Sequence, residues 1–295
     1  MALIDVLKFI VRHPLNQGRR VDAVLRFARW QIGSRLLREP VVHEWIAGSR
    51  FLVRHGETGL TGNLYAGLHE FADMAFVMHA LRPTDLFVDI GANAGSYTIL
   101  ACAVAKARGC AFEPLPSTYR RLTDNVRLNG LEDRVRCLNM AVGSEPGEAR
   151  FTTELDTINH IVGSGEAAAG AISVPVTTLD AALGADAPWL MKIDVEGYEL
   201  PVLEGAGATL RQDTLHAVIL ELNGSGERYG HDEGRIVSMM ADHGFEPCSY
   251  DPFARELLNA DGPSQTGNTI FVRHRALVSK RLKDAPQVPV NGRPV

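Results

Sequence analysis

The stretch FVDIGANAGSYTIL, residues 87–100, predicts the fold of this chain. An apolar strand runs into Asp89, and Gly91 and Gly95 follow before a helix is expected to begin near Ser96. Glycine-rich turns between a strand and a helix often hold phosphate, because backbone N–H groups attract anions. The dinucleotide pattern is G-x-G-x-x-G, whereas this turn reads D-x-G-x-x-x-G and lacks the third glycine. Because a carboxylate here would repel a pyrophosphate, the turn favours a ligand with a cationic group and hydroxyls.

Apolar strands alternate with helices after this turn. Strands are expected at LFVDI, CAFEP, VRCLNMAV, LMKIDVEG, LHAVILELN, FEPCSY and NTIFVRH. Buried strands that alternate with helices imply a mostly parallel sheet covered on both faces. We therefore predict an α/β, Rossmann-like domain over residues 56–275.

Glu113 ends the second predicted strand, 22 residues after Gly91. An acid at this point of such a sheet accepts hydrogen bonds from the ribose hydroxyls of an adenosine cofactor. S-adenosylmethionine carries a sulfonium, an ammonium and an adenosine but no phosphate, so the turn and Glu113 together predict this cofactor. The alternative interpretation is that Asp89 caps the helix and Glu113 lies on the surface.

Several motifs in series resemble the FkbM-type S-adenosylmethionine-dependent methyltransferases. They are FVDIGANAGSYTILA, AFEPLPSTYRRLTDNVRLNG, NMAVGSEPGEARF, TTLDAAL and MKIDVEGYELPVLEGA, and they cover about residues 59–206. The resemblance implies a class I methyltransferase fold, with a seven-stranded sheet whose last strand is antiparallel, and O-methylation of a hydroxyl on a natural product, sugar or lipid. By motif match, the residues assigned to the cofactor are Asp89, Gly91, Asn93, Gly95, Glu113 and Ala141.

The segment KIDVEGYE supplies the candidate catalytic groups. Lys192 lies inside an apolar strand, and Asp194 and Glu196 follow at its carboxyl end, beside the predicted glycine turn. Because an aliphatic hydroxyl is a poor nucleophile, we expect a general base among Asp194, Glu196 and His160, the last on an inserted segment that could fold over the cleft. The alternatives are an ion pair between Asp194 and Lys192, a helix cap, or a loop histidine without a role.

A metal ion could replace the general base. The fifth predicted strand ends in ELN, which places Glu221 and Asn223 near Asp194 in such a fold. Carboxylate and amide oxygens suit Mg²⁺. We expect no metal and keep Asp194, Glu221 and Asn223 as the alternative magnesium set.

Charge divides the chain into an acidic body and two basic ends. Residues 1–54 hold ten Lys/Arg and four Asp/Glu (+6), residues 55–272 hold 14 and 30 (−16), and residues 273–295 hold six and one (+5). An acidic body argues against nucleic-acid binding. We expect residues 1–55 to form a helix, with an apolar period over residues 21–37, and a hairpin over residues 41–54. We favour packing of this extension on the body or in a homodimer, because Arg29 interrupts the apolar face of a short helix; contact with a membrane surface is the alternative. Residues 276–295, which include three prolines, are expected to be disordered.

The sequence leaves three functions open. The first is an O-methyltransferase for a small hydroxylated acceptor: a sugar, a lipid or a secondary metabolite. The others are an NAD- or nucleotide-sugar-binding Rossmann-like protein and a non-catalytic protein. Four cysteines without a C-x-x-C pair, no apolar run of about 20 residues and no evident signal peptide predict a cytoplasmic protein.

Overall fold

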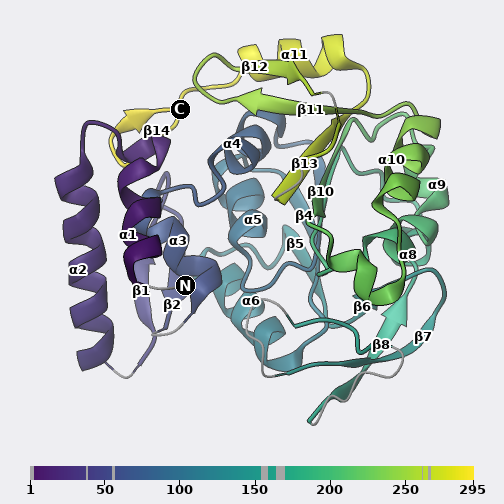
Figure 1. The fold of residues 1–295 in the computed structure, drawn as a ribbon, viewed down its shortest axis with the longest axis horizontal. Coiled ribbons are helices and arrows are strands. Elements are labelled where there is room, and N and C mark those ends of the chain that lie inside the picture. The colour runs from purple at the N-terminus through teal and green to yellow at the C-terminus, as the bar shows by residue number, and fades with distance from the viewer. Residues whose placement is uncertain are drawn as a thin grey trace.

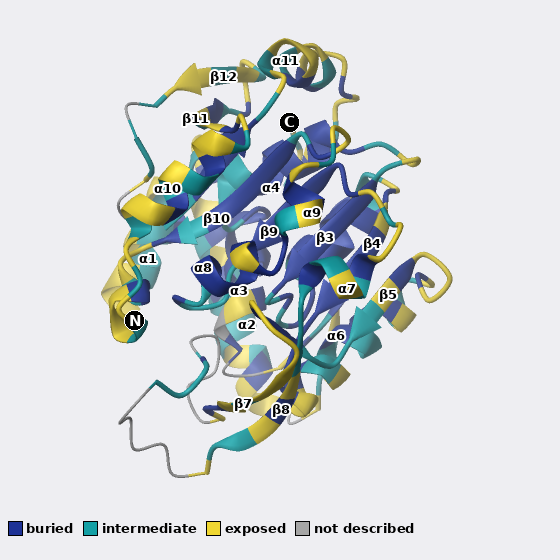
Figure 2. Ribbon diagram, turned by 90° about the vertical axis from the view of Figure 1, so that its right-hand side faces the viewer, coloured by how far each residue is buried: buried dark blue, intermediate teal, exposed yellow. Residues whose placement is uncertain are grey.

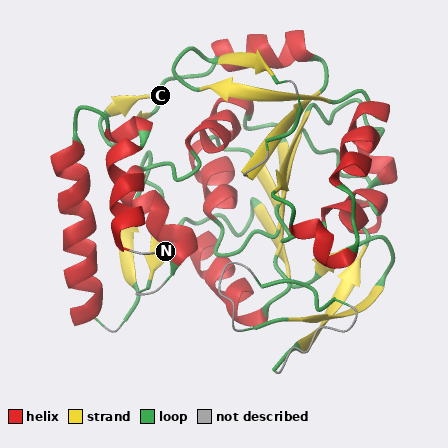
Figure 3. Cartoon of the chain, viewed as in Figure 1, coloured by secondary structure: helices red, strands yellow, loops and turns green. Residues whose placement is uncertain are grey.

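The computed structural model describes residues 3–37, 39–54, 57–153, 159–163, 170–260, 262–264 and 267–295. An eight-stranded sheet lies at its centre, with helices on both faces (Figures 1 and 3). In spatial order its strands are β12 (Glu256–Asn259), β11 (Glu246–Asp251), β13 (Gly267–Val272), β10 (Ala217–Leu222), β9 (Leu190–Ile193), β3 (Leu86–Ile90), β4 (Arg108–Phe112) and β5 (Val135–Leu138).

The predicted α/β fold is confirmed. Strands β5, β4, β3, β9 and β10 are mutually parallel, and β13 is antiparallel to both of its neighbours. These six strands and β11 are the seven predicted ones. The sequence did not reveal β12, an edge strand that pairs with β11, because its residues are mostly exposed and form no buried apolar run.

Side chains of the central strands alternate between the two faces of the sheet. Figure 2 shows these strands as buried. On β3, Phe87 packs towards one face, whereas Val88 and Ile90 pack towards the other. Asp89 therefore shares the face of Phe87, as does its register partner Lys192 on β9. Two charged side chains thus lie side by side on adjacent central strands of the sheet.

Different helices cover the two faces. One face packs on α4 (Phe71–Ala80), α5 (Ser96–Ile99), the π-helical turn η2 (Leu100–Val104) and α6 (Pro116–Leu128). The other packs on α7 (Leu179–Leu183), α8 (Glu199–Glu204), α9 (Gly207–Leu210) and α10 (Glu233–Asp242). The chain leaves β3 towards β4 on one side and later returns to β9 on the other. Ligands bind outside the carboxyl ends of the strands at such a switch point.

The inserted segment forms a small sheet of its own. Its order is β6 (Ala141–Val142), β8 (Ile172–Thr177) and β7 (Gly147–Phe151). The 3₁₀ turn η4 (Ser225–Tyr229) reaches this region, where the Tyr229 hydroxyl donates to the carbonyl of Ile161 at 2.5 Å. The insertion is therefore attached to the turn that follows β10.

The N-terminal extension contains the predicted helix and hairpin. Helix α2 (Arg20–Leu36) packs against α1 (Leu3–Arg12) and α3 (Thr58–Ala66), with the turn η1 (Pro14–Asn16) between α1 and α2. Strands β1 (Val41–Glu44) and β2 (Arg50–Val53) form the hairpin. None of the described helices is long and apolar enough to cross a membrane.

The prediction of a disordered tail over residues 276–295 is wrong. Helix α11 (Arg275–Lys283) is followed by the paired strands β14 (Pro289–Val290) and β15 (Arg293–Pro294). Val290 and Val295 are buried in the main core. The Arg293 guanidinium also donates to the carbonyl of Pro14 at 2.6 Å. These contacts with distant parts of the chain order the tail, and its proline-rich composition gave no sign of them.

Candidate active site

A cavity of about 390 Å³ lies at the carboxyl ends of the central strands. This volume falls within the range of small-molecule sites. Its walls come from the turn after β3, the ends of β4, β9 and β10, and the start of α4. The charged groups that line it are Glu70, Asp89, Glu113, Lys192, Asp194, Glu196 and Glu221, together with His69. Six carboxyl groups and one lysine therefore make this site acidic.

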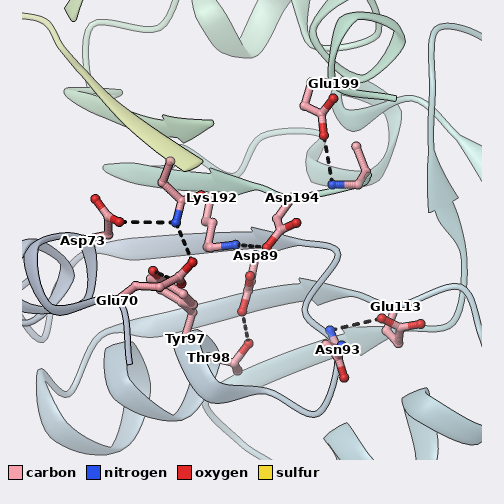
Figure 4. A network of polar contacts seen from close by, with 12 residues as sticks. Glu70, Asp73, Asp89, Asn93, Tyr97, Thr98, Glu113, Lys192, Asp194 and Glu199 are labelled. Carbon is pink, nitrogen blue, oxygen red and sulfur yellow. Dashed lines mark hydrogen bonds and ion pairs between the residues drawn. The ribbon is translucent and has the colours of Figure 1, made fainter. Parts of the chain in front are cut away.

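Asp89 holds the turn to its helix. Its carboxylate accepts a hydrogen bond from the Thr98 hydroxyl at 2.6 Å, and the residue is buried (Figure 4). Burial raises the pKa of Asp89 to about 6, while the nearby Lys192 charge and the Thr98 bond act in the opposite direction. Asp89 thus has a structural role, because it joins β3 to α5. It also lies beside Lys192, the only lysine among the described residues that line the cavity.

Lys192 forms the central ion pair of the site. Its ammonium lies 2.5 Å from the Asp194 carboxylate and 4.7 Å from the centre of the Tyr97 ring. Burial disfavours the charged lysine, but Asp194, Glu70 and Asp89 raise its pKa above the usual value. Burial likewise opposes ionisation of Asp194, but the Lys192 charge and hydrogen bond lower the pKa of Asp194. The ion pair considered from the sequence is therefore present.

Asp194 also meets two other carboxyl groups. Oxygen atoms of Asp194, Glu196 and Glu221 all lie within 4.8 Å of one another. Burial and then the Asp194 charge raise the pKa of Glu221 to about 9, so Glu221 is neutral at pH 7. Burial, Asp194 and Glu199 raise the pKa of Glu196 to about 7. The three acids therefore have different protonation states at neutral pH.

Glu113 stabilises the glycine turn as well as facing the cavity. Its two carboxylate oxygens accept hydrogen bonds from the backbone N–H groups of Asn93 at 3.0 Å and Leu115 at 2.9 Å. Burial raises its pKa to about 7, although these bonds oppose the shift. Each carboxylate oxygen has two lone pairs, so Glu113 retains capacity for hydroxyl donors.

Neighbouring protein atoms leave no room for a side chain at either glycine of the turn. Gly91 has φ +81°, and a Cβ there would lie 1.9 Å from the Asp194 backbone oxygen. Gly95 has φ +94°, and its Cβ would lie 2.7 Å from a Leu122 methyl group. These glycines therefore let the turn after β3 lie close to the end of β9 and to α6.

Besides Gly95, three predicted residues do not line the main cavity. Ala141 lines a small adjoining cavity that shares Gly91 and Val195 with the main one. His160 is buried, and its backbone bonds to Thr152, while the adjacent Asn159 lines the main cavity. Asn223 accepts from the backbone N–H of Ser225 at 2.9 Å, and it is not among the residues that line the described cavity. Of the magnesium set named from the sequence, Asp194 and Glu221 lie together, with Glu196 as the third carboxyl group beside them.

Sequence reasoning missed a second group of polar residues. The Tyr97 hydroxyl donates to Glu70 at 2.7 Å, and the Asn268 amide donates to Glu70 at 2.9 Å and to Asp73 at 3.3 Å (Figure 4). Asn268 is opposite Glu221 in the β10–β13 register. The one available signal was the pair of acids in HEFADMAF, an otherwise apolar helix start.

Comparison with known proteins now assigns the family. Residues 89–247, slightly more than half of the chain, match the family model described as the methyltransferase FkbM domain. The chain belongs to the FkbM methyltransferase family. This is the family that the sequence motifs resemble.

Two curated proteins are similar to this FkbM-family chain. The hexuronic acid methyltransferase AglP of Haloferax volcanii is 30% identical over 144 residues, which are 47% of this chain and 56% of AglP. A tRNA(Phe) (4-demethylwyosine(37)-C(7)) aminocarboxypropyltransferase of Pyrococcus horikoshii is 32% identical over 114 residues, 36% of this chain and 40% of the relative. The chain thus spans about half the length of the curated relatives it matches.

Among solved structures, a methyltransferase FkbM from Methylobacillus flagellatus KT aligns with a TM-score of 0.43 and 15% identity. The alignment covers 85% of this chain and 60% of that one.

Proposed function

We propose that this FkbM-family protein transfers a methyl group from S-adenosylmethionine to a hydroxyl of a small molecule, sugar or lipid-linked compound. The observation that carries this proposal is one cavity that joins the Glu113 turn to Asp194, Glu196 and Glu221. Figure 4 shows Glu113 and Asn93 set apart from Lys192 and Asp194. This separation suits a cofactor region beside an acceptor region.

The residues present fit the cofactor. The cavity is acidic, as suits a sulfonium and an ammonium, and Glu113 can accept hydroxyl donors. The residues that would hold it are those of the turn, Asp89 to Gly95, with Glu113 and, at the adjoining cavity, Ala141. When bound, the cofactor supplies an electrophilic methyl group.

The acids beside Lys192 would prepare the acceptor. Lys192 keeps Asp194 ionised, so Asp194 can accept a hydrogen bond from the acceptor hydroxyl and orient its oxygen. Glu196 has a pKa of about 7, a value suited to taking that proton at neutral pH. Because His160 does not line the described cavity, it is the weakest of the three catalytic candidates.

The charge of the cavity favours a neutral or cationic acceptor. Lys192 is its only lysine among the described lining residues, and Asp194 already pairs with it. An anionic acceptor would therefore lie near Asp194 and Glu70, and the described lining residues include no unpaired lysine or arginine to offset the repulsion. Similarity to a hexuronic acid methyltransferase supports an acceptor of the sugar class.

The direct test is methyl transfer from labelled S-adenosylmethionine to matched acceptors. We expect label in a neutral sugar or an amino sugar, and much less in the uronic acid with the same ring. Mass spectrometry would locate the methyl group on oxygen. Binding of NADH without binding of S-adenosylhomocysteine would instead support the oxidoreductase alternative, and no binding of either would support a non-catalytic protein.

Glu113→Ala should weaken the binding of S-adenosylhomocysteine by about 1.5–3 kcal/mol, the range for hydrogen bonds to a charged group. Calorimetry on both proteins measures the difference. Glu113→Gln is the control that keeps the size of the side chain, and a circular dichroism spectrum checks that the turn and fold persist. Equal affinity in the wild type and Glu113→Ala would remove Glu113 from the cofactor site.

The activity should rise with pH through about 7. Burial and the charges of Asp194 and Glu199 raise the pKa of Glu196, while Arg228 and Lys192 act in the opposite direction. A base is active when deprotonated, so kcat/KM should be low below this pKa and reach a plateau above it. Glu196→Gln should lower kcat/KM and remove its decrease below pH 7. If kcat/KM of Glu196→Gln still decreases below pH 7, another group is the base.

A further inference from the structure

Helix α2 has apolar side chains on two opposite faces. The inner face contains Ala23, Phe27 and Trp30, which pack with α1 and α3. Val21, Leu25, Ile32 and Leu36 form a second row, which we call the α2 stripe, and they are between 46% and 77% exposed. At about 100° per residue, the four positions fall within about 60° of one another and opposite the inner face.

The inner face is already satisfied by the protein. The Phe27 and Tyr65 rings meet edge to face at 5.1 Å, and the Arg26 guanidinium donates to Asn16 and to the Tyr65 carbonyl. The α2 stripe therefore cannot turn inward without breaking these contacts. Its apolar surface is available to something outside the chain.

The last residues of the chain lie beside this helix pair. The Arg19 guanidinium donates to the carbonyl of Asn291 at 3.0 Å, and Arg293 donates to that of Pro14. Figure 1 shows the C-terminus and β14 next to α1 and α2. By sequence, residues 1–54 carry +6, against −16 for the body. Of the C-terminal cations, Arg293 lies here, whereas Arg281 and Lys283 of α11 pair with Asp85 and Glu256. One side of the molecule is thus both basic and apolar.

Exposed apolar side chains are concentrated on the same side. Of the large hydrophobic residues exposed in the described part of the chain, most lie in residues 3–42, and the others are Phe253, Leu258 and Leu277. Arg29 and Arg35, both exposed, flank the α2 stripe. A helix with an apolar row flanked by basic residues suits the interface of an anionic bilayer.

We propose that the α2 stripe and the surrounding basic residues dock this protein on a membrane surface that carries anionic headgroups. A second copy fits less well. Two stripes in contact would bring two segments of +6 together, and four large side chains are few against the 20–30 residues on each side of a typical interface. Docking on the acidic body of a copy would offer the stripe only Phe253 and Leu258 as exposed large apolar partners among the described residues.

The test is co-sedimentation of the full chain with vesicles of phosphatidylcholine, alone or mixed equally with phosphatidylglycerol. We expect binding to the mixed vesicles, weak binding to the neutral ones, and release in about 0.5 M NaCl, which shortens the screening length to a few ångströms. Leu25→Gln/Ile32→Gln should weaken binding at least about tenfold with no change in net charge. Arg29→Gln/Arg35→Gln should weaken it and reduce its salt dependence.

The matched control is Leu258→Gln/Leu277→Gln, the same kind of change at exposed positions on β12 and α11. It should bind as the wild type does, and thermal unfolding should be the same in all variants. Three results would overturn the proposal. They are a wild type that does not bind the mixed vesicles, a wild type that binds the neutral vesicles equally well, and a control variant that loses as much vesicle binding as Leu25→Gln/Ile32→Gln. A dimer in light scattering that the Leu25→Gln/Ile32→Gln change abolishes would assign the stripe to a second copy instead. Cofactor binding should be unchanged in these variants, so this test is independent of the proposed methyl transfer.

Discussion

Asp194→Asn should lower the turnover of methyl transfer by about 10²–10⁴-fold, an effect as large as that of a general base, because the variant loses both the charge that orients the acceptor hydroxyl and its influence on Glu196. The substitution keeps the shape of the side chain and removes the charge that the acceptor hydroxyl would meet. Because Asp194 contacts Lys192 and two carboxyl groups, its charge also sets the protonation of Glu221. We therefore expect a larger effect on kcat than on cofactor affinity.

Two measurements make this prediction specific. The affinity for S-adenosylhomocysteine and the melting temperature of Asp194→Asn report cofactor binding and folding separately from chemistry. Wild-type turnover with a saturating acceptor would exclude the role. If EDTA reproduces the loss in the wild type and Mg²⁺ restores it, the trio of Asp194, Glu196 and Glu221 holds a metal instead.

The parts of the site that could be predicted from the sequence are local in the chain. The turn after β3 is marked by Asp89, Gly91 and Gly95 within seven residues, and the acid at the end of β4 is marked by its strand. The Lys192–Asp194 contact is also local, since the two residues are two positions apart on β9 and beyond its end. Strand order then brings these segments together, because the carboxyl ends of parallel strands share one edge.

The parts that could not be predicted depend on contacts between distant segments. Asn268 meets Glu70 across 198 residues of sequence, and only the antiparallel pairing of β13 with β10 brings it there. The C-terminal tail is ordered by contacts with Pro14 and with the core, 279 residues away in the first case. No periodicity or composition records such pairings, whereas tertiary packing fixes them.

Lys192→Met should destabilise the protein by about 3–5 kcal/mol, the usual cost of removing one partner from a buried ion pair. Lys192 is 3% exposed, and Asp194, Glu70 and Asp89 all raise its pKa. Methionine fills a similar volume, so the loss is mainly that of the charge. Without this charge the neighbouring acids would be left without a cation in the described cavity wall, and their folded-state pKa values would rise further.

The pH dependence distinguishes this mechanism from simple loss of packing. An acid whose pKa is raised in the folded state stabilises the fold while protonated, and that contribution disappears as pH rises through the folded pKa. Asp89, with a pKa of about 6 in the wild type, is one such group. The loss in the free energy of unfolding caused by Lys192→Met, measured by urea unfolding, should therefore be smaller at about pH 5 than at pH 8. The double variant Asp194→Asn/Lys192→Met should lose less unfolding free energy than the sum of the losses in the two single variants. The reason is that the second change removes a charge that the first left unpaired.

The control is Lys283→Met, which breaks the exposed pair with Glu256 at 3.3 Å. Exposed pairs contribute about 0–1 kcal/mol, so this variant should unfold close to the wild type at both pH values. A deficit of Lys192→Met that is the same at both pH values would point to lost packing rather than an uncompensated charge. If Lys192→Met lowers the free energy of unfolding no more than Lys283→Met does, then water or a rearranged Asp194 solvates the site. The ion pair would then not be the contact that orders the cavity.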